Sequence, residues 1–134
     1  MSIRAIPLLV LAFVLYNAIV LSLGEGSLAG QIFEIKLLSG GVWKFTWGDF
    51  ILLITLVLLF IEIVKSTFTT TSTLIDHALS MVVFMAVGAE FLMVPQAATS
   101  VFFLILVATL IDVIGGYTIG IRVARRDLNI GADQ

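Results

Sequence analysis

The chain has 134 residues, a formal net charge of −2 and no cysteine; 60% of it is hydrophobic and only 12% is charged. Soluble domains carry about 25% charged residues, so this composition argues against a soluble globular protein, and the same figures exclude disorder. The acidic balance excludes a nucleic-acid partner, and the lack of cysteine excludes disulfides, thiolate metal sites and thiol nucleophiles. We therefore expect a small integral membrane protein whose first partner is the lipid bilayer.

Four apolar segments have the length of transmembrane helices, since a hydrocarbon core about 30 Å thick requires about 20 mostly apolar residues. They are residues 6–23, 50–64, 74–94 and 100–121. The first segment follows a basic residue, as the apolar region of a signal peptide does. Its apolar run is longer than that region usually is, so we expect a retained membrane anchor. The predicted fold is one all-α membrane domain over residues 1–134, a four-transmembrane-helix bundle.

The expected helix ends carry sequence signals. Two pairs have capping-box spacing before the second and third segments, Thr46 with Asp49 and Thr73 with Asp76. Pro95 ends the third helix, and Thr99 has the position of an N-cap for the fourth. Only a few residues separate these two helices, which predicts that they are antiparallel neighbours.

Residues 31–47 follow a different period from the four spans. Apolar side chains alternate with polar ones on either side of a glycine-rich turn: Phe33, Ile35, Leu37, Trp43, Phe45 and Trp47 alternate with Glu34, Lys36, Lys44 and Thr46. Period-two alternation around such a turn predicts a β-hairpin between the first two helices. We expect its aromatic face to rest on the bundle or on the lipid interface, where Trp is favoured. The alternative is a lid, or an edge on which a partner strand docks.

The distribution of basic residues predicts the orientation. In a four-span chain, five lie on one side and two on the other: Arg4, Lys65, Arg122, Arg125 and Arg126 against Lys36 and Lys44. The positive-inside rule then places both termini in the cytoplasm and the hairpin outside. Residues 122–134 form a cytoplasmic basic tail in this interpretation, next to anionic lipid headgroups.

Ionisable side chains inside a bilayer are costly, so each one in the predicted spans is a candidate site. The candidates are Glu62, Asp76, His77, Glu90 and Asp112, with Tyr16 and Asn17 as polar neighbours. Glu62 has the spacing for a helical ion pair with Lys65. Asp76 opens the third helix, where the helix dipole favours a carboxylate. Because His77 is the single histidine, we expect no metal site within one chain, although a role for His77 in a proton relay stays open.

Glu90 and Asp112 are open to two interpretations each. Glu90 is either an interfacial carboxylate or a group that bonds to the hairpin, Asn17 or Tyr16. Asp112 lies near the middle of its span, in a row of small residues that lets helices approach closely: Ala108, Gly116, Gly120 and Ala124. A buried aspartate needs a partner or stays protonated, so Asp112 is an interhelical bonding group or a protonatable site. The possible partners are Tyr16, Asn17, Thr55, Glu62 and Ser80, and we expect no basic residue at that depth.

Several short pieces of the chain resemble a family of small four-span bacterial inner-membrane proteins. They are residues 15–17, Trp43, residues 46–49, residues 76–77, residues 90–92, residues 99–100, residues 112–116, Arg122 and residues 125–126. The resemblance implies a topology and a bacterial inner membrane, but no particular activity. The span count and the hairpin are also similar in architecture to claudin-like bundles, without the cysteine pair of that hairpin.

The sequence has no nucleophile elbow, P-loop or HExxH motif, so we expect no catalytic residue, cofactor or metal site. The leading hypothesis is a non-enzymatic accessory subunit or self-associating scaffold of a membrane complex. The alternative is a proton- or cation-coupled transporter or channel that works as an oligomer through Glu90, Asp112 and Glu62. A membrane enzyme acting on lipid or quinone is the third hypothesis.

Overall fold

The computed structural model describes residues 6–67 and 73–132. Within them the order is α1 (Leu9–Leu23), a 3₁₀ turn η2 (Glu25–Ala29), β1 (Gln31–Lys36), β2 (Val42–Thr46), α2 (Trp47–Lys65), α3 (Thr73–Met93), a 3₁₀ turn η3 (Pro95–Ala97) and α4 (Ser100–Ala132). The predicted combination of helices with one hairpin is therefore confirmed. Three of these helices, α2, α3 and α4, are long and apolar enough to cross a membrane. The apolar helix α1 has 15 residues and is shorter, about 22 Å by its rise.

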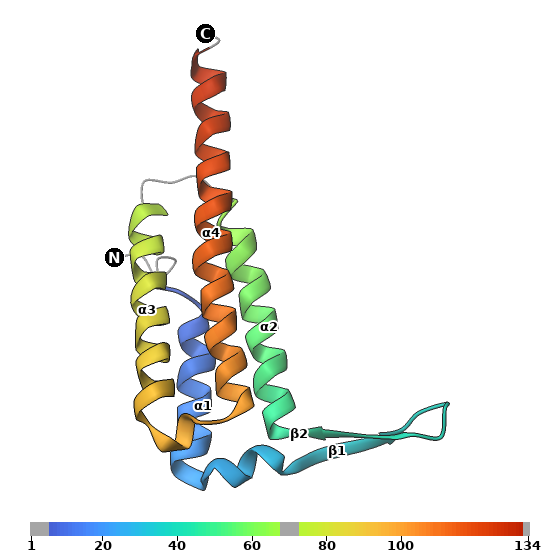
Figure 1. The fold of residues 1–134 in the computed structure, drawn as a ribbon. Coiled ribbons are helices and arrows are strands. Elements are labelled where there is room, and N and C mark those ends of the chain that lie inside the picture. The colour runs from blue at the N-terminus through green and yellow to red at the C-terminus, as the bar shows by residue number, and fades with distance from the viewer. Residues whose placement is uncertain (1–5, 68–72, 133–134) are drawn as a thin grey trace.

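The helices run up and down beside one another, and α4 lies at the centre of the bundle (Figure 1). It packs against α3 and α2 along much of its length and against α1 near its start. The short η3 connection makes α3 and α4 antiparallel neighbours, as the loop length predicts.

The core near the hairpin end of the bundle is built around Tyr16 of α1. Its ring is 1% exposed and meets the edge of Phe102 at a centroid distance of 4.9 Å. Its hydroxyl lies 2.9 Å from the Gln96 carbonyl oxygen, to which it donates, and 2.7 Å from Thr99 Oγ1. Thr99 Oγ1 also accepts the Phe102 amide at 3.2 Å, which confirms Thr99 as the N-cap of α4. One buried tyrosine thus joins α1 to the turn between α3 and α4.

The start of α2 differs from the predicted one by three residues. The Thr46 hydroxyl oxygen accepts the Asp49 amide at 3.2 Å, and Asp49 Oδ2 accepts the Thr46 amide at 3.1 Å. This capping box is the predicted one, and it starts the helix directly after β2, so Trp47 is its first residue and the hairpin ends at Thr46. The side chain of Thr73 lies outside the described residues, and with it the second predicted box. Helix α1 begins at Leu9, after Pro7, because a proline restricts the residue before it to extended conformations.

Helix α4 continues well past its predicted end at residue 121. Its 33 residues reach Ala132, a length of about 50 Å that exceeds the 30 Å hydrocarbon core. No proline interrupts this stretch, and Arg, Ala and Leu favour helix. The predicted basic tail is therefore a continuation of α4 that projects beyond the other helices (Figure 1), with Arg122, Arg125 and Arg126 exposed.

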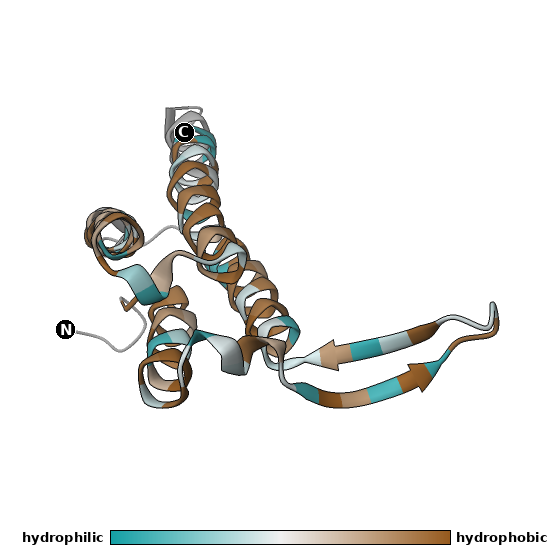
Figure 2. Ribbon diagram, turned by 60° about the horizontal axis from the view of Figure 1, so that its bottom comes forward, coloured by the Kyte–Doolittle hydropathy of each residue, from teal (hydrophilic) through white to brown (hydrophobic). Residues whose placement is uncertain are grey.

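The hairpin is antiparallel, as predicted, but it does not fold back on the bundle. Its paired residues are Gln31 with Thr46, Phe33 with Phe45, Glu34 with Lys44, Ile35 with Trp43, and Lys36 with Val42. Every residue of β1 is exposed, and the two strands extend sideways from the start of α2 (Figures 1 and 2). Of the two places expected for its aromatic face, the bundle is therefore excluded, and the lipid interface stays a prediction. The reason is local, because β2 passes into α2 at the capping box without a linker that would let it turn back.

Candidate functional site

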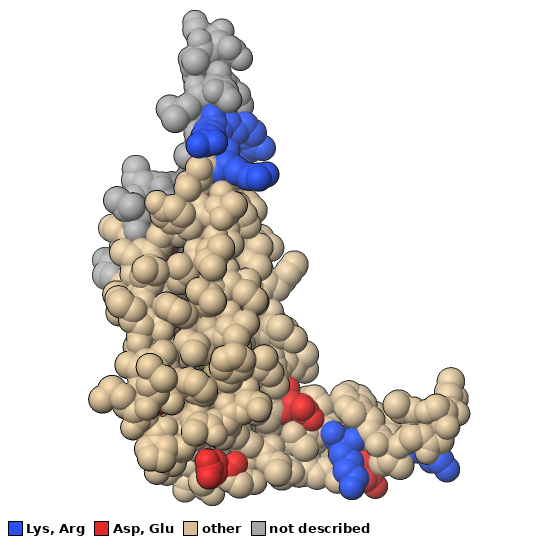
Figure 3. All heavy atoms as spheres, in the orientation of Figure 1, with Lys and Arg blue, Asp and Glu red and all other residues tan. Residues whose placement is uncertain are grey.

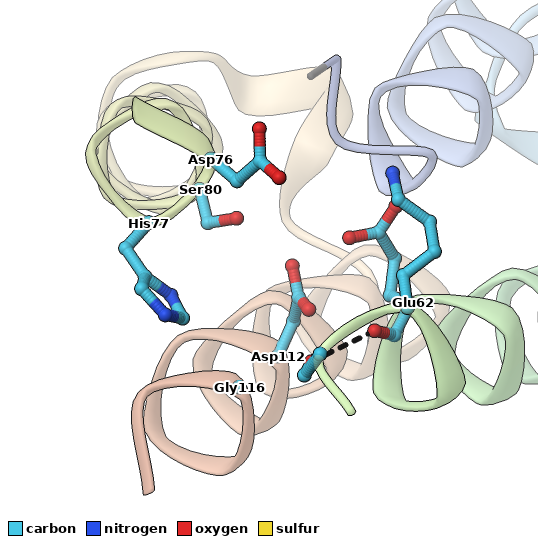
Figure 4. Close-up of a pocket in the computed structure, with 8 residues that line it drawn as sticks. Glu62, Asp76, His77, Ser80, Asp112 and Gly116 are labelled. Atoms are coloured by element: carbon cyan, nitrogen blue, oxygen red, sulfur yellow. Dashed lines mark hydrogen bonds and ion pairs between the residues drawn. The ribbon is translucent and has the colours of Figure 1, made fainter. Parts of the chain in front are cut away.

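A small polar cavity lies where α2 ends, α3 begins and α4 passes between them (Figure 4). Its volume is about 30 Å³, and its lining is Glu62, Lys65 and Ser66 of α2, Asp76, His77 and Ser80 of α3, and Asp112 and Gly116 of α4. A polar space of this size holds about two water molecules. Four of the five ionisable residues proposed from sequence therefore meet at one place.

Glu62 connects the end of α2 to the start of α1. It is 7% exposed, and its Oε1 atom accepts Lys65 Nζ at 3.1 Å and the backbone amide of Leu8 at 2.8 Å. The ion pair expected from the spacing is thus confirmed. The Leu8 amide is one of the unpaired donors at a helix start, so the same carboxylate also stabilises the beginning of α1.

Asp112 is buried within the bundle and points into the cavity (Figure 4). It is 6% exposed, and Ser80 of α3, which lies across the cavity from it, is 8% exposed. Of the five partners proposed for it, Ser80 and Glu62 line the same cavity. The other three bond elsewhere: Tyr16 to Gln96 and Thr99, Asn17 to the Phe13 carbonyl, and Thr55 to the Ile51 carbonyl.

Asp76 also points into the space between α3 and α4 (Figure 4). Its Oδ1 atom is buried and has no hydrogen-bond partner among the described residues. Together with Glu62 and Asp112 it brings three carboxyl groups to one small cavity. Buried oxygen atoms without partners are costly, so a water molecule or a proton in this cavity lowers the free energy of the folded state.

Sequence reasoning missed Ser66 and named Lys65 only as the ion-pair partner of Glu62, and the expectation that no basic residue lies at the depth of Asp112 is wrong. Lys65 lines the same cavity. Asp112 stands beside the last turn of α2 rather than beside its middle, since it lines the cavity with Glu62 and Lys65. It faces Ser80, which is only about 10 Å along α3 from the start of that helix. The spacing of Glu62 and Lys65 was the available signal, but it could not show which helix lies beside them.

Two side chains approach the backbone of Gly116 closely. A Cβ atom there would lie 3.2 Å from Ser66 Oγ and 3.5 Å from His77 Cε1. The His77 ring is held edge-on against Tyr117, with centroids 5.5 Å apart. His77 thus fills the wall of the cavity between α3 and α4 (Figure 4).

The predicted stripe of small residues faces the inside of the bundle. Ala108 is 4% exposed and packs with Leu9 and Leu59, and Gly116 and Gly120 are buried. The side chain of Ala124 lies outside the described residues. The stripe therefore lets α4 approach its own neighbours in the chain.

Glu90 does not belong to the cavity, since it lies fourteen residues from Asp76 on the same helix, about 21 Å away. Its Oε2 atom is buried without a hydrogen-bond partner among the described residues. Of the side chains expected to bond to it, Tyr16 bonds to Gln96 and Thr99, and Asn17 bonds to the Phe13 carbonyl oxygen. The candidate residues thus divide into a cavity group and Glu90 near the other end of α3.

The described residues contain no group of three or more His, Cys, Asp or Glu side chains placed to hold a metal ion. Chemically, the cavity has room for water beside three carboxyl groups. Comparison of the chain with models of known protein families, with curated proteins and with solved structures finds no match.

Proposed function

We propose that the chain is a non-enzymatic protein of a bacterial inner membrane that crosses the bilayer four times and serves as an accessory subunit or self-associating scaffold of a membrane complex. The observation that carries this proposal is that buried polar side chains form hydrogen bonds between different elements of the bundle. Tyr16 bonds to the turn before α4, and Glu62 bonds to the start of α1. Each of them joins two elements of the bundle, which is what polar groups do when they stabilise helix association in a membrane.

The charge distribution supports an orientation with both termini in the cytoplasm. Arginine side chains gather where α4 projects beyond the bundle, whereas acidic side chains lie together with lysines near the hairpin end (Figure 3). Arg122, Arg125 and Arg126 belong to the first group, and Glu25, Glu34 and Asp49 to the second. The excess of arginine marks the cytoplasmic side. Helix α1 is short for a span, and local thinning of the bilayer accommodates such a helix at modest cost.

Cysteine labelling tests this orientation, because the chain has no cysteine of its own. We expect an impermeant maleimide to label Ser39→Cys in intact cells and to label Ala132→Cys only after the membrane is opened. The two variants serve as controls for each other. Labelling of Ala132→Cys alone in intact cells would overturn the orientation.

An assembly partner has to contact the outer faces of the helices, because the small-residue stripe is already used inside the bundle. We expect purification in a mild detergent to retain a second membrane protein or further copies of this chain. Light scattering on the purified particle measures its mass. A monomer with no retained partner would contradict the scaffold proposal.

A second candidate function is proton- or cation-coupled transport by an oligomer, and the polar cavity favours it. Three carboxyl groups surround a space that can hold water, and the Asp76 Oδ1 atom is buried there without a partner among the described residues. In this function Asp112, Asp76 and Glu62 carry the proton or the cation. Glu90 is separate from them, at the other end of α3.

Replacing Asp112 with Asn distinguishes the two functions, because it keeps the shape and removes the titratable proton. In the scaffold function, Asp112→Asn leaves detergent stability and assembly unchanged. In the transport function it abolishes proton-coupled flux in liposomes while the fold survives, and Glu25→Gln, at an exposed carboxyl group, is the matched control. Asp112→Leu damages assembly in either case, since it crowds the packed face of α4.

A further inference from the structure

We propose that the β1–β2 hairpin lies in the plane of the bilayer surface, with its aromatic face inserted among the lipids of the leaflet in which α1 ends and α2 begins. This inference rests on the proposed crossing of a bilayer by the helices. The occupant of the aromatic face is therefore lipid, at the boundary between the headgroups and the acyl chains.

The two faces of the hairpin have opposite chemistry. Phe33, Phe45 and Trp43 form one cluster, in which Phe33 stacks on Phe45 at 4.8 Å and meets Trp43 edge-on at 5.8 Å. The rings are large and stay open to the surroundings, with Phe33 41% and Trp43 45% exposed. On the other face Glu34 stands directly opposite Lys44, so opposite charges pair across the strands. The alternation along both strands is visible in Figure 2.

The hairpin also has the right direction for this role. It extends sideways from the start of α2, at the level where α1 ends (Figure 1). Its charged side chains gather on the side that faces away from the bundle (Figure 3). The aromatic face is therefore turned toward the region that the helices cross, which is the side occupied by lipid.

The base of the hairpin is held rigidly enough to keep this direction. The capping box fixes the junction of β2 with α2, and the Trp47 amide donates to the Gly30 carbonyl oxygen at 3.0 Å. The backbone is closely packed at Gly30, where a Cβ atom would lie 3.3 Å from the Trp47 ring and 3.1 Å from the Ser27 carbonyl oxygen. The hairpin is thus an arm joined to the bundle at two points rather than a free loop.

An apolar groove continues the lipid-facing surface at this base. It has a volume of about 270 Å³ and lies beside Trp47, between Ile19 and Leu23 of α1 and the turn that carries Ser27 and Gly30. A groove with this lining suits an acyl chain and offers little to a polar ligand. Interfacial tryptophans and lysines determine the depth and tilt of a membrane helix, so the hairpin would act as an anchor that sets α2 in the bilayer.

Tryptophan quenching in lipid nanodiscs tests the inference, because the chain has only two tryptophans, Trp43 and Trp47. The variant Trp47→Phe leaves Trp43 as a reporter on the aromatic face. The matched control carries Trp43→Phe, Trp47→Phe and Lys44→Trp, which puts the single reporter on the charged face one residue away. Lys36→Trp replaces Lys44→Trp if that protein does not fold. The probes are phosphatidylcholine brominated near the headgroup end of its chains and aqueous iodide.

We expect Trp43 to emit at shorter wavelength than the control, to be quenched more strongly by brominated lipid and to be quenched less by iodide. Equal quenching at both positions would overturn the inference. Protection of Trp43 from iodide without quenching by brominated lipid would also overturn it, and would indicate that a second chain covers the hairpin. A protein that does not float with liposomes after an alkaline wash contradicts the membrane proposal itself, so the two failures are distinguishable.

Discussion

The hydroxyl group of Tyr16 offers the sharpest test of how polar contacts stabilise this bundle. Tyr16→Phe keeps the ring against Phe102, 4.9 Å between centroids, and removes only the two contacts of the hydroxyl, at 2.9 Å to the Gln96 carbonyl and 2.7 Å to Thr99 Oγ1. The change therefore isolates hydrogen bonding from packing. The N-cap of α4 survives, since Thr99 keeps its bond to the Phe102 amide.

The expected loss in the free energy of unfolding is about 1 kcal/mol, because interhelical hydrogen bonds in membrane proteins contribute about 0.6 kcal/mol on average and about 1.7 at most. Tyr16→Ala should cost about 3–5 kcal/mol, since it also leaves a cavity in the core. Tyr117→Phe is the matched control: it removes the same hydroxyl from a residue that is 55% exposed, and we expect a change within about 0.5 kcal/mol.

Titration of the purified protein with SDS in a mild detergent, followed by far-ultraviolet circular dichroism, measures these differences. A cycle with Thr99→Val assigns the energy to the Tyr16–Thr99 pair, for which we expect a coupling of about 0.6 kcal/mol. If Tyr16→Phe and Tyr117→Phe unfold at the same SDS concentration, the hydroxyl contributes no stability and the reasoning is refuted.

Two further predictions concern the cavity end of the bundle and use the same titration. Gly116→Leu should destabilise the fold by about 1–3 kcal/mol, because a Cβ atom there already approaches Ser66 Oγ to 3.2 Å. Gly115→Leu is the control and should be neutral or stabilising, because a Cβ atom at position 115 meets no atom within 4 Å. Equal effects of the two changes would show that the close approach at Gly116 is not needed. Glu62→Leu should lower the free energy of unfolding by about 1–3 kcal/mol, since it leaves the Leu8 amide and Lys65 without their acceptor. Glu62→Gln keeps an acceptor and should lower it less. A Glu62→Leu protein as stable as the natural chain would show that Glu62 does not stabilise the start of α1.

Local signals in the sequence were sufficient for the class of protein and for its elements. Hydropathy alone identifies the apolar helices, because about 20 apolar residues in succession suit a bilayer whatever their neighbours are. The hairpin is recognisable from its period of two, and the start of α2 from the box formed by Thr46 and Asp49, since these patterns act over a few residues of the chain. The Glu62–Lys65 pair was predictable for the same reason.

Only the tertiary structure decided which polar side chains meet. Asp112 and Lys65 share a cavity because of the axial offset between α4 and α2, which is set by all the contacts of the two helices together and not by any short motif. The same holds for Tyr16, whose partners are eighty residues or more away in the sequence. The direction of the hairpin likewise follows from how its base joins α2 and Gly30, a geometry that alternation along the strands does not encode.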